Sequence, residues 1–178
     1  MDDESHGESN RLLPVVRYIG PDEIIAELRL RNSYKPVKAT VFLSHDVCVR
    51  EPHLTWYGMA SLKELVELHV NEEKALYEKN VRYYLGSGKS EVNKGIQHTL
   101  SHDPQAFFYL NNGVTALCNS VASKDRTANR RKLVIHGLSI INGAQTVASA
   151  AELMNQPNPP DISSARVMFT LIQANADG

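Results

Sequence analysis

Two Asn-Gly corners carry the side chains that are best suited to ligand binding in this sequence. Asn111-Asn112-Gly113 stands before an apolar run, and Asn142-Gly143 stands before an Ala-rich segment with Gln145 and Thr146 on its first turn. Amide and hydroxyl side chains both donate and accept hydrogen bonds, as base edges and phosphate oxygens require. Glycine also lets the backbone approach a ligand with no side chain in the way. These residue types fit a site for a nucleotide or a nucleic acid.

The second corner coincides with the expected start of a helix over residues 144–154. A helix start presents backbone amides without intrahelical partners and about half a unit of positive charge, so it attracts phosphates and carboxylates. A purely structural interpretation is equally open, because Asn is a common N-cap and Gly a common turn residue. Asn111-Asn112-Gly113 likewise fits a plain turn into a strand that begins near Val114.

A third polar group lies on the helical segments that flank a Gly/Ser-rich loop, GSGKS. Asn80 and Arg82 precede the loop, and Asn93 and Lys94 follow it. The guanidinium of Arg can bind a phosphate through two parallel hydrogen bonds, and the ammonium of Lys attracts it as a point charge. The loop itself lacks the spacing and the preceding strand of a phosphate-binding loop. The four flanking residues are therefore candidate ligand contacts, whereas the loop is not.

The sequence contains no motif that announces catalysis or metal binding. His98 and His102 can share a helix face, but no third ligand accompanies them, so no metal site is predicted. Cys48 and Cys118 lie far apart in apolar surroundings and are expected to be buried, reduced thiols. Neither a nucleophile elbow nor a paired-carboxylate motif is present, so catalytic residues and cofactor stay unassigned.

Composition indicates one cytoplasmic domain. The chain has 178 residues, of which 42% are hydrophobic and 22% charged, as in soluble globular proteins. A net charge of −1 means that any nucleic-acid surface must be local. The most basic stretch, SKDRTANRRK, is expected to be a solvated loop. The polar start, MDDESHGESN, is unlike a signal peptide, and no apolar run is long enough to span a membrane, so no membrane partner is predicted.

The order of expected elements predicts an α+β or irregular α/β fold, with a mixed sheet packed against several helices in a single main domain. Ser61 and Glu64 have the spacing of a capping box at the start of a helix. Strands over residues 114–121 and 132–141 are expected to pair in antiparallel fashion across the basic loop. Further helices are expected over residues 21–30, 72–86, 91–100 and 144–154, and further strands over residues 41–49 (with a turn near 44–46), 53–59 and 165–174.

Four separated motifs give the chain a specific family resemblance. LYEKNVRYYLG, EVNKGIQHTL, FFYLNNGVTAL and LSIINGAQTV resemble the AIPR (abortive infection phage resistance) proteins in order and spacing, from about Leu54 to the C-terminus. The resemblance implies an AIPR-like domain over residues 54–178, which we expect to be truncated at its C-terminus, after an N-terminal helix/strand segment over residues 11–53. Residues 1–10 lack apolar residues after Met1 and are expected to be an acidic, disordered start. The motif positions are Asn80, Arg82, Gly86, Asn93, Lys94, Asn111, Asn112, Gly113, Asn142, Gly143, Gln145 and Thr146.

The resemblance implies a bacterial defence protein that acts against phage, with other defence-system proteins as potential partners. Our hypothesis is that the motif residues, Gly86 apart, line one mildly cationic cleft for a nucleotide or a nucleic acid. One alternative is a nuclease or nucleotide hydrolase whose remaining catalytic residues lie beyond residue 178. Another is a structural or regulatory module with a buried amide network. Exposure of Arg82, Asn112 and Gln145 discriminates, because a network requires all three to be buried and mutually bonded.

Overall fold

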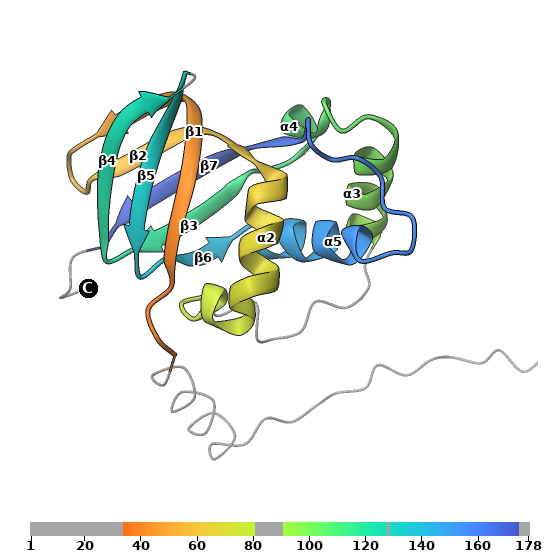
Figure 1. The fold of residues 1–178 in the computed structure, drawn as a ribbon, viewed down its shortest axis with the longest axis horizontal. Coiled ribbons are helices and arrows are strands. Elements are labelled where there is room, and N and C mark those ends of the chain that lie inside the picture. Colours follow the sequence, from red (N-terminus) through yellow and green to blue (C-terminus); the bar gives the residue numbers. More distant parts are fainter. Residues whose placement is uncertain (1–33, 81–90, 128, 175–178) are drawn as a thin grey trace, which may run out of the picture. The chain divides into compact units, whose positions relative to one another are not determined.

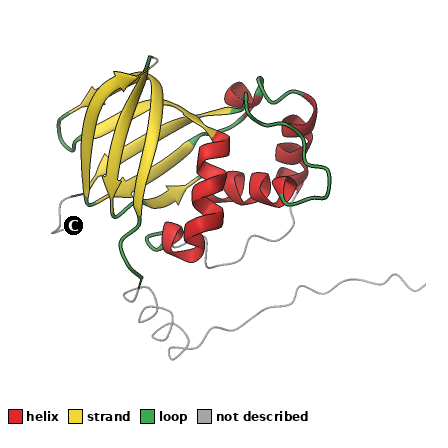
Figure 2. Ribbon diagram, in the orientation of Figure 1, coloured by secondary structure: helices red, strands yellow, loops and turns green. Residues whose placement is uncertain are grey.

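A mixed sheet of seven strands and a group of helices beside it make up the computed structural model (Figures 1 and 2), which describes residues 34–80, 91–127 and 129–174. The predicted α+β class is confirmed. The helix expected over residues 21–30, the disordered start over residues 1–10, the GSGKS loop and Arg82 lie outside the described residues. The compact unit that holds the sheet begins at Tyr34, so the strand ending at Val49 belongs to it.

The strands follow the order β4-β5-β1-β2-β7-β3-β6 across the sheet. Neighbouring strands are antiparallel except for β3 and β7, which are parallel. The strand bounds are Lys38–Val49 (β1), Thr55–Ser61 (β2), Val114–Cys118 (β3), Ser120–Thr127 (β4), Arg130–His136 (β5), Ser139–Asn142 (β6) and Arg166–Gln173 (β7).

The sheet curls so strongly that one or two residues suffice to connect strands from its opposite ends. Asn119 alone separates β3 from β4, and Gly137 with Leu138 separates β5 from β6. Gly137 has φ +71°, and a Cβ there would collide with the Asn119 side chain, so the bend needs glycine. Each of the two strands expected over residues 114–121 and 132–141 is therefore broken in two. Their predicted antiparallel pairing is confirmed on both sides of the bend.

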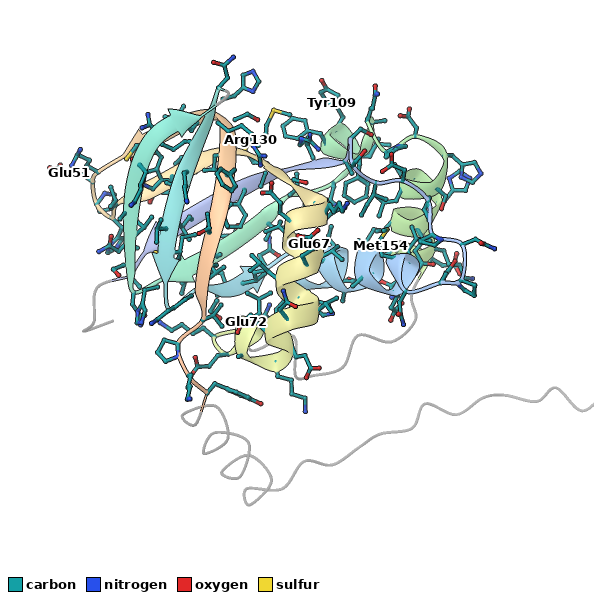
Figure 3. The ribbon with its side chains drawn as sticks, in the orientation of Figure 1. Glu51, Glu67, Glu72, Tyr109, Arg130 and Met154 are labelled. Atoms are coloured by element: carbon teal, nitrogen blue, oxygen red, sulfur yellow. The ribbon has the colours of Figure 1, made fainter. Side chains whose placement is uncertain are left out.

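The basic stretch expected to be a solvated loop instead extends a hairpin. β4 and β5 pair from Ser120↔His136 to Thr127↔Arg130. Arg130 donates to the Glu64 carboxylate at 2.6 Å, and Arg131 donates to Asp46 at 3.2 Å; Figure 3 labels Arg130. Since strand pairing satisfies the backbone and both arginines have acidic partners, this stretch serves the fold. The loop prediction was wrong.

β1 is one continuous strand where a turn was expected. Ala39, Val41 and Leu43 are buried while their neighbours face outward, as the two-residue period of a strand requires. The polar Ser44-His45-Asp46 segment forms a bulge, with His45 at φ 52°, and the pairing with β2 resumes beyond it. An interruption of the strand near residues 44–46 was predicted, but it is a bulge and not a turn.

Five helical segments lie to one side of the sheet within the described residues (Figure 2). The predicted helix does begin directly after Ser61, but the capping box does not form, because Ser61 ends β2 and makes no side-chain cap. Instead, the Leu62 amide donates to the Ala165 carbonyl at 3.1 Å. Only a short 3₁₀ turn represents the described part of the helix expected over residues 72–86. The bounds are Leu62–Glu72 (α2), Glu73–Tyr77 (η1, 3₁₀), Glu91–His102 (α3), Phe107–Leu110 (α4) and Ala144–Met154 (α5).

Helix α5 sits between α2 and α3 and contacts both. Its buried face is built largely of small residues, among them Ala144, Ala150 and Ala151. Small side chains let neighbouring helices approach closely, so this face explains why the segment is Ala-rich. Val147 and Leu153 extend the same face into the core. Among the described residues, no helix is long and apolar enough to cross a membrane.

The two cysteines should differ sharply in reactivity. Cys118 is fully buried, and this burial raises the pKa of its thiol to about 11, although the Lys79 ammonium opposes part of the shift. Because the thiolate is the reactive form, Cys118 should resist alkylation near neutral pH. Iodoacetamide labelling followed by peptide mass spectrometry should modify half-buried Cys48 first and Cys118 only after unfolding. Equal labelling rates in the folded protein would contradict this.

Candidate functional site

The two Asn-Gly corners share one pocket with a volume of about 400 Å³. One corner lies between α4 and β3, and the other lies between β6 and α5. The corners supply most of its polar lining, and residues of α3 and α4 supply most of its apolar lining. The pocket is lined by Val92, Gly95, Ile96, Thr99, Phe107, Leu110, Asn111, Asn112, Gly113, Asn142, Gly143, Gln145 and Thr146.

The corners touch through their glycines. Gly143 has φ +82°, and a Cβ there would lie 2.6 Å from the Gly113 carbonyl oxygen and 2.9 Å from Val114 Cγ2. Gly113 has φ +78°, and a Cβ there would lie 2.6 Å from the Met168 carbonyl oxygen. Both the left-handed backbone and the lack of space favour glycine at these positions. The glycines therefore let two chain turns and strand β7 stack backbone on backbone.

Hydrogen bonds between side chains also join the corners. The Asn111 Oδ1 atom accepts from the Gly113 amide at 3.0 Å, which fixes the first turn. The Asn111 Nδ2 group donates to Thr146 Oγ1 at 3.2 Å, which ties that turn to α5. Gln145 Nε2 donates to Asn93 Oδ1 at 2.6 Å, which ties α5 to α3. The pocket walls are thus held by their own amide groups.

Donors and acceptors remain open to a ligand at the pocket edge. Asn112 and Asn142 are exposed, and their side chains have no hydrogen-bond partner in the part of the chain that the structure describes. The first intrahelical bond of α5 runs from the Val147 amide to the Gly143 carbonyl, so the amides of residues 144–146 precede it. None of the described lining residues is ionisable. Among the described lining residues, the start of α5 supplies partial positive charge through its backbone amides.

Three residues predicted for the site stand apart from the pocket. Asn80 is buried and donates to the Ile140 carbonyl at 3.1 Å, so it supports the backbone of β6 and does not line the pocket. The Lys94 side chain is 76% exposed and pairs with Glu91 at 2.7 Å. Asn93 contributes through its bond to Gln145 and does not line the pocket. The expected cationic lining is therefore missing from the described residues, because the nearest lysine candidate is paired outside the pocket.

Sequence reasoning missed the apolar wall. Val92 and Ile96 are not among the site residues predicted from the sequence, yet both line the pocket. Val92 is 58% exposed and Leu110 is 71% exposed, so both side chains are accessible to a ligand in the pocket. Tyr109, also on α4, is exposed as well (labelled in Figure 3), but it does not line the pocket. The spacing of Val92, Ile96 and Thr99 on one helix face was the available clue.

Other parts of the described chain offer less to a ligand. No group of three potential metal ligands occurs within the described ranges. The His98 and His102 rings stack at 4.2 Å, and His102 Nδ1 lies 2.9 Å from the His98 carbonyl oxygen. A second hollow lies between α2 and Met154 of α5, with Glu67 on its rim (Figure 3), but neither Asn-Gly corner lines it. The pocket at the two Asn-Gly corners, which we call the amide pocket, is therefore the candidate site.

Comparison with known proteins gives one family. The family model described as AIPR protein matches residues 77–177, which is more than half of the chain. The match covers both Asn-Gly corners and all helices from α3 onward, but it begins after β1, β2 and α2. No curated protein and no solved structure matches the chain.

Substitution of Gly143 tests the contact between the corners. Gly143→Ala forces a side chain into a left-handed backbone and against the Gly113 carbonyl oxygen, so it should reduce the free energy of unfolding by about 2 kcal/mol or more. Urea unfolding measures the change. Asn142→Ala, an exposed neighbour, should change stability by less than about 0.5 kcal/mol. Equal stability of the Gly143→Ala variant and the wild type would refute the contact.

Proposed function

The chain belongs to the AIPR family of abortive infection phage resistance proteins, and we propose that it serves phage defence by binding a nucleotide, free or within a nucleic acid, in the amide pocket. The observation that carries this proposal is the meeting of the two Asn-Gly corners on one pocket wall. Each corner alone is explained as a turn. Together they line a single hollow with open amide groups.

The pocket has the size and the mixed polarity that a nucleotide requires. Its volume of about 400 Å³ lies within the range of small-molecule sites. Val92, Ile96 and Leu110 offer an apolar surface to the face of a base, and Asn112 and Asn142 offer hydrogen bonds to its edge. The start of α5 adds backbone donors that suit an edge acceptor or a phosphate.

Two alternatives receive less support from the described residues. A metal-dependent nuclease or hydrolase needs carboxylates at the reacting centre, and none lines the described pocket. A buried amide network needs Asn112 and Gln145 to be enclosed, but Asn112 is exposed and Gln145 is half-buried. Among the described residues, Asn80 does have the buried, bonded position that such a network predicts.

A binding screen with Gln145→Ala tests the proposal. DNA, RNA and the common nucleotides are titrated against the wild type and this variant by calorimetry. Loss of one pocket hydrogen bond and of the link to Asn93 should weaken binding about tenfold.

The matched control is Gln156→Ala, which removes the same amide group at an exposed position beyond the other end of α5. It should bind like the wild type. Thermal unfolding of each variant separates lost contact from lost fold. Equal binding by the wild type and Gln145→Ala removes the α5 corner from the site, and no binding by the wild type rejects the proposal.

A further inference from the structure

Gly95 lies inside helix α3, where glycine is a poor choice. The helix runs from Glu91 to His102, so Gly95 is flanked by helical residues on both sides. Glycine destabilises a helix interior more than any residue except proline, because it gives up more backbone freedom on folding. A glycine at such a position calls for a specific reason.

Neither packing nor backbone geometry within the described residues supplies that reason. A Cβ built at Gly95 meets no atom within 4 Å, and its φ lies outside the left-handed region. Gly113, Gly137 and Gly143 differ in both respects, since each has a positive φ and a crowded Cβ position. Alanine would therefore fit at residue 95 and would favour the helix.

Gly95 does line the amide pocket. Val92, Ile96 and Thr99 lie one helical turn or less away on the same face and line it too. The Thr99 hydroxyl donates to the Gly95 carbonyl at 3.1 Å, so this polar pair is satisfied within the helix. The helix surface at Gly95 is left flat and open, and it lines the same pocket as Asn112 and Gln145.

We propose that Gly95 is the seat of a flat, uncharged heterocyclic base, which stacks on the α3 backbone and directs its polar edge toward the two Asn-Gly corners. This inference rests on the proposed nucleotide-binding function and names the part of the nucleotide that enters. An uncharged ring fits because none of the described lining side chains is ionisable. The phosphates then lie toward solvent. The base comes either from a free nucleotide or from an unpaired position in a strand.

The test compares Gly95→Ala with the wild type in both stability and binding. A methyl group at the seat should weaken the binding of adenosine, guanosine, cytidine or uridine, whichever binds the wild type, about tenfold or more. The same change should raise the melting temperature by about 2–4 °C, since alanine favours the helix. A gain in stability with a loss of binding identifies a residue kept for the ligand.

The matched control is Ser101→Ala, which also favours α3 but lies on its exposed surface away from the pocket. It should bind nucleosides like the wild type. Unchanged nucleoside binding by Gly95→Ala, together with weakened binding by Gln145→Ala, overturns the seat but keeps the proposed function. Failure of every nucleoside and nucleotide to bind the wild type overturns both.

Inorganic pyrophosphate tests which part of the nucleotide enters. It should bind at least about tenfold more weakly than the best nucleoside, because the pocket offers it no cationic side chain among the described residues. Pyrophosphate binding as tight as that of the nucleoside overturns the seat. A single-stranded trinucleotide that binds more tightly than any nucleoside assigns the base to a strand, and the reverse order assigns it to a free nucleotide.

Discussion

The contact between Gly143 and the Gly113 carbonyl oxygen is the constraint on which the candidate site depends. A side chain at Gly143 would need the space that the Gly113 carbonyl and Val114 occupy. Any larger residue would push α5 away from the turn before β3 and open the wall between them. The bond from Asn111 to Thr146 spans the same junction and requires the same approach. Backbone stacking, rather than side-chain packing, therefore shapes the pocket's polar wall.

The sheet brings these distant turns to one place. β3 pairs with β6, and the register sets Thr115 opposite Asn142, so the turn before β3 and the turn after β6 are neighbours. α5 then begins at this junction and runs between α2 and α3, which fixes its direction and brings the apolar face of α3 opposite the amides. The result is a hollow lined by apolar residues of α3 and α4 and by polar residues of the two corners, which suits the nucleobase that we propose.

Local chemistry was readable from the sequence, but long-range partners were not. The helix over residues 144–154 and both Asn-Gly corners follow from glycine, asparagine and apolar periodicity within a few residues. The capping box predicted at Ser61 does not form, because the Glu64 carboxylate accepts a hydrogen bond from Arg130 instead. The basic stretch is not a solvated loop, because it pairs as a hairpin and Arg131 bonds to Asp46. Asn80 was predicted to line the cleft, but it bonds to the β6 backbone at Ile140, 60 residues away. Such pairings depend on the tertiary fold, which spacing along the chain does not encode.

The most direct measurement is a nuclear magnetic resonance titration of the whole chain with the tightest nucleoside. We expect saturable shifts of the backbone amides of Gly113, Ala144 and Gln145, with one common dissociation constant, because one ligand contacts both corners. The Gly95 amide should shift with them. Saturable shifts at one corner alone, or at the β4–β5 hairpin while the corners stay unchanged, would contradict a shared site.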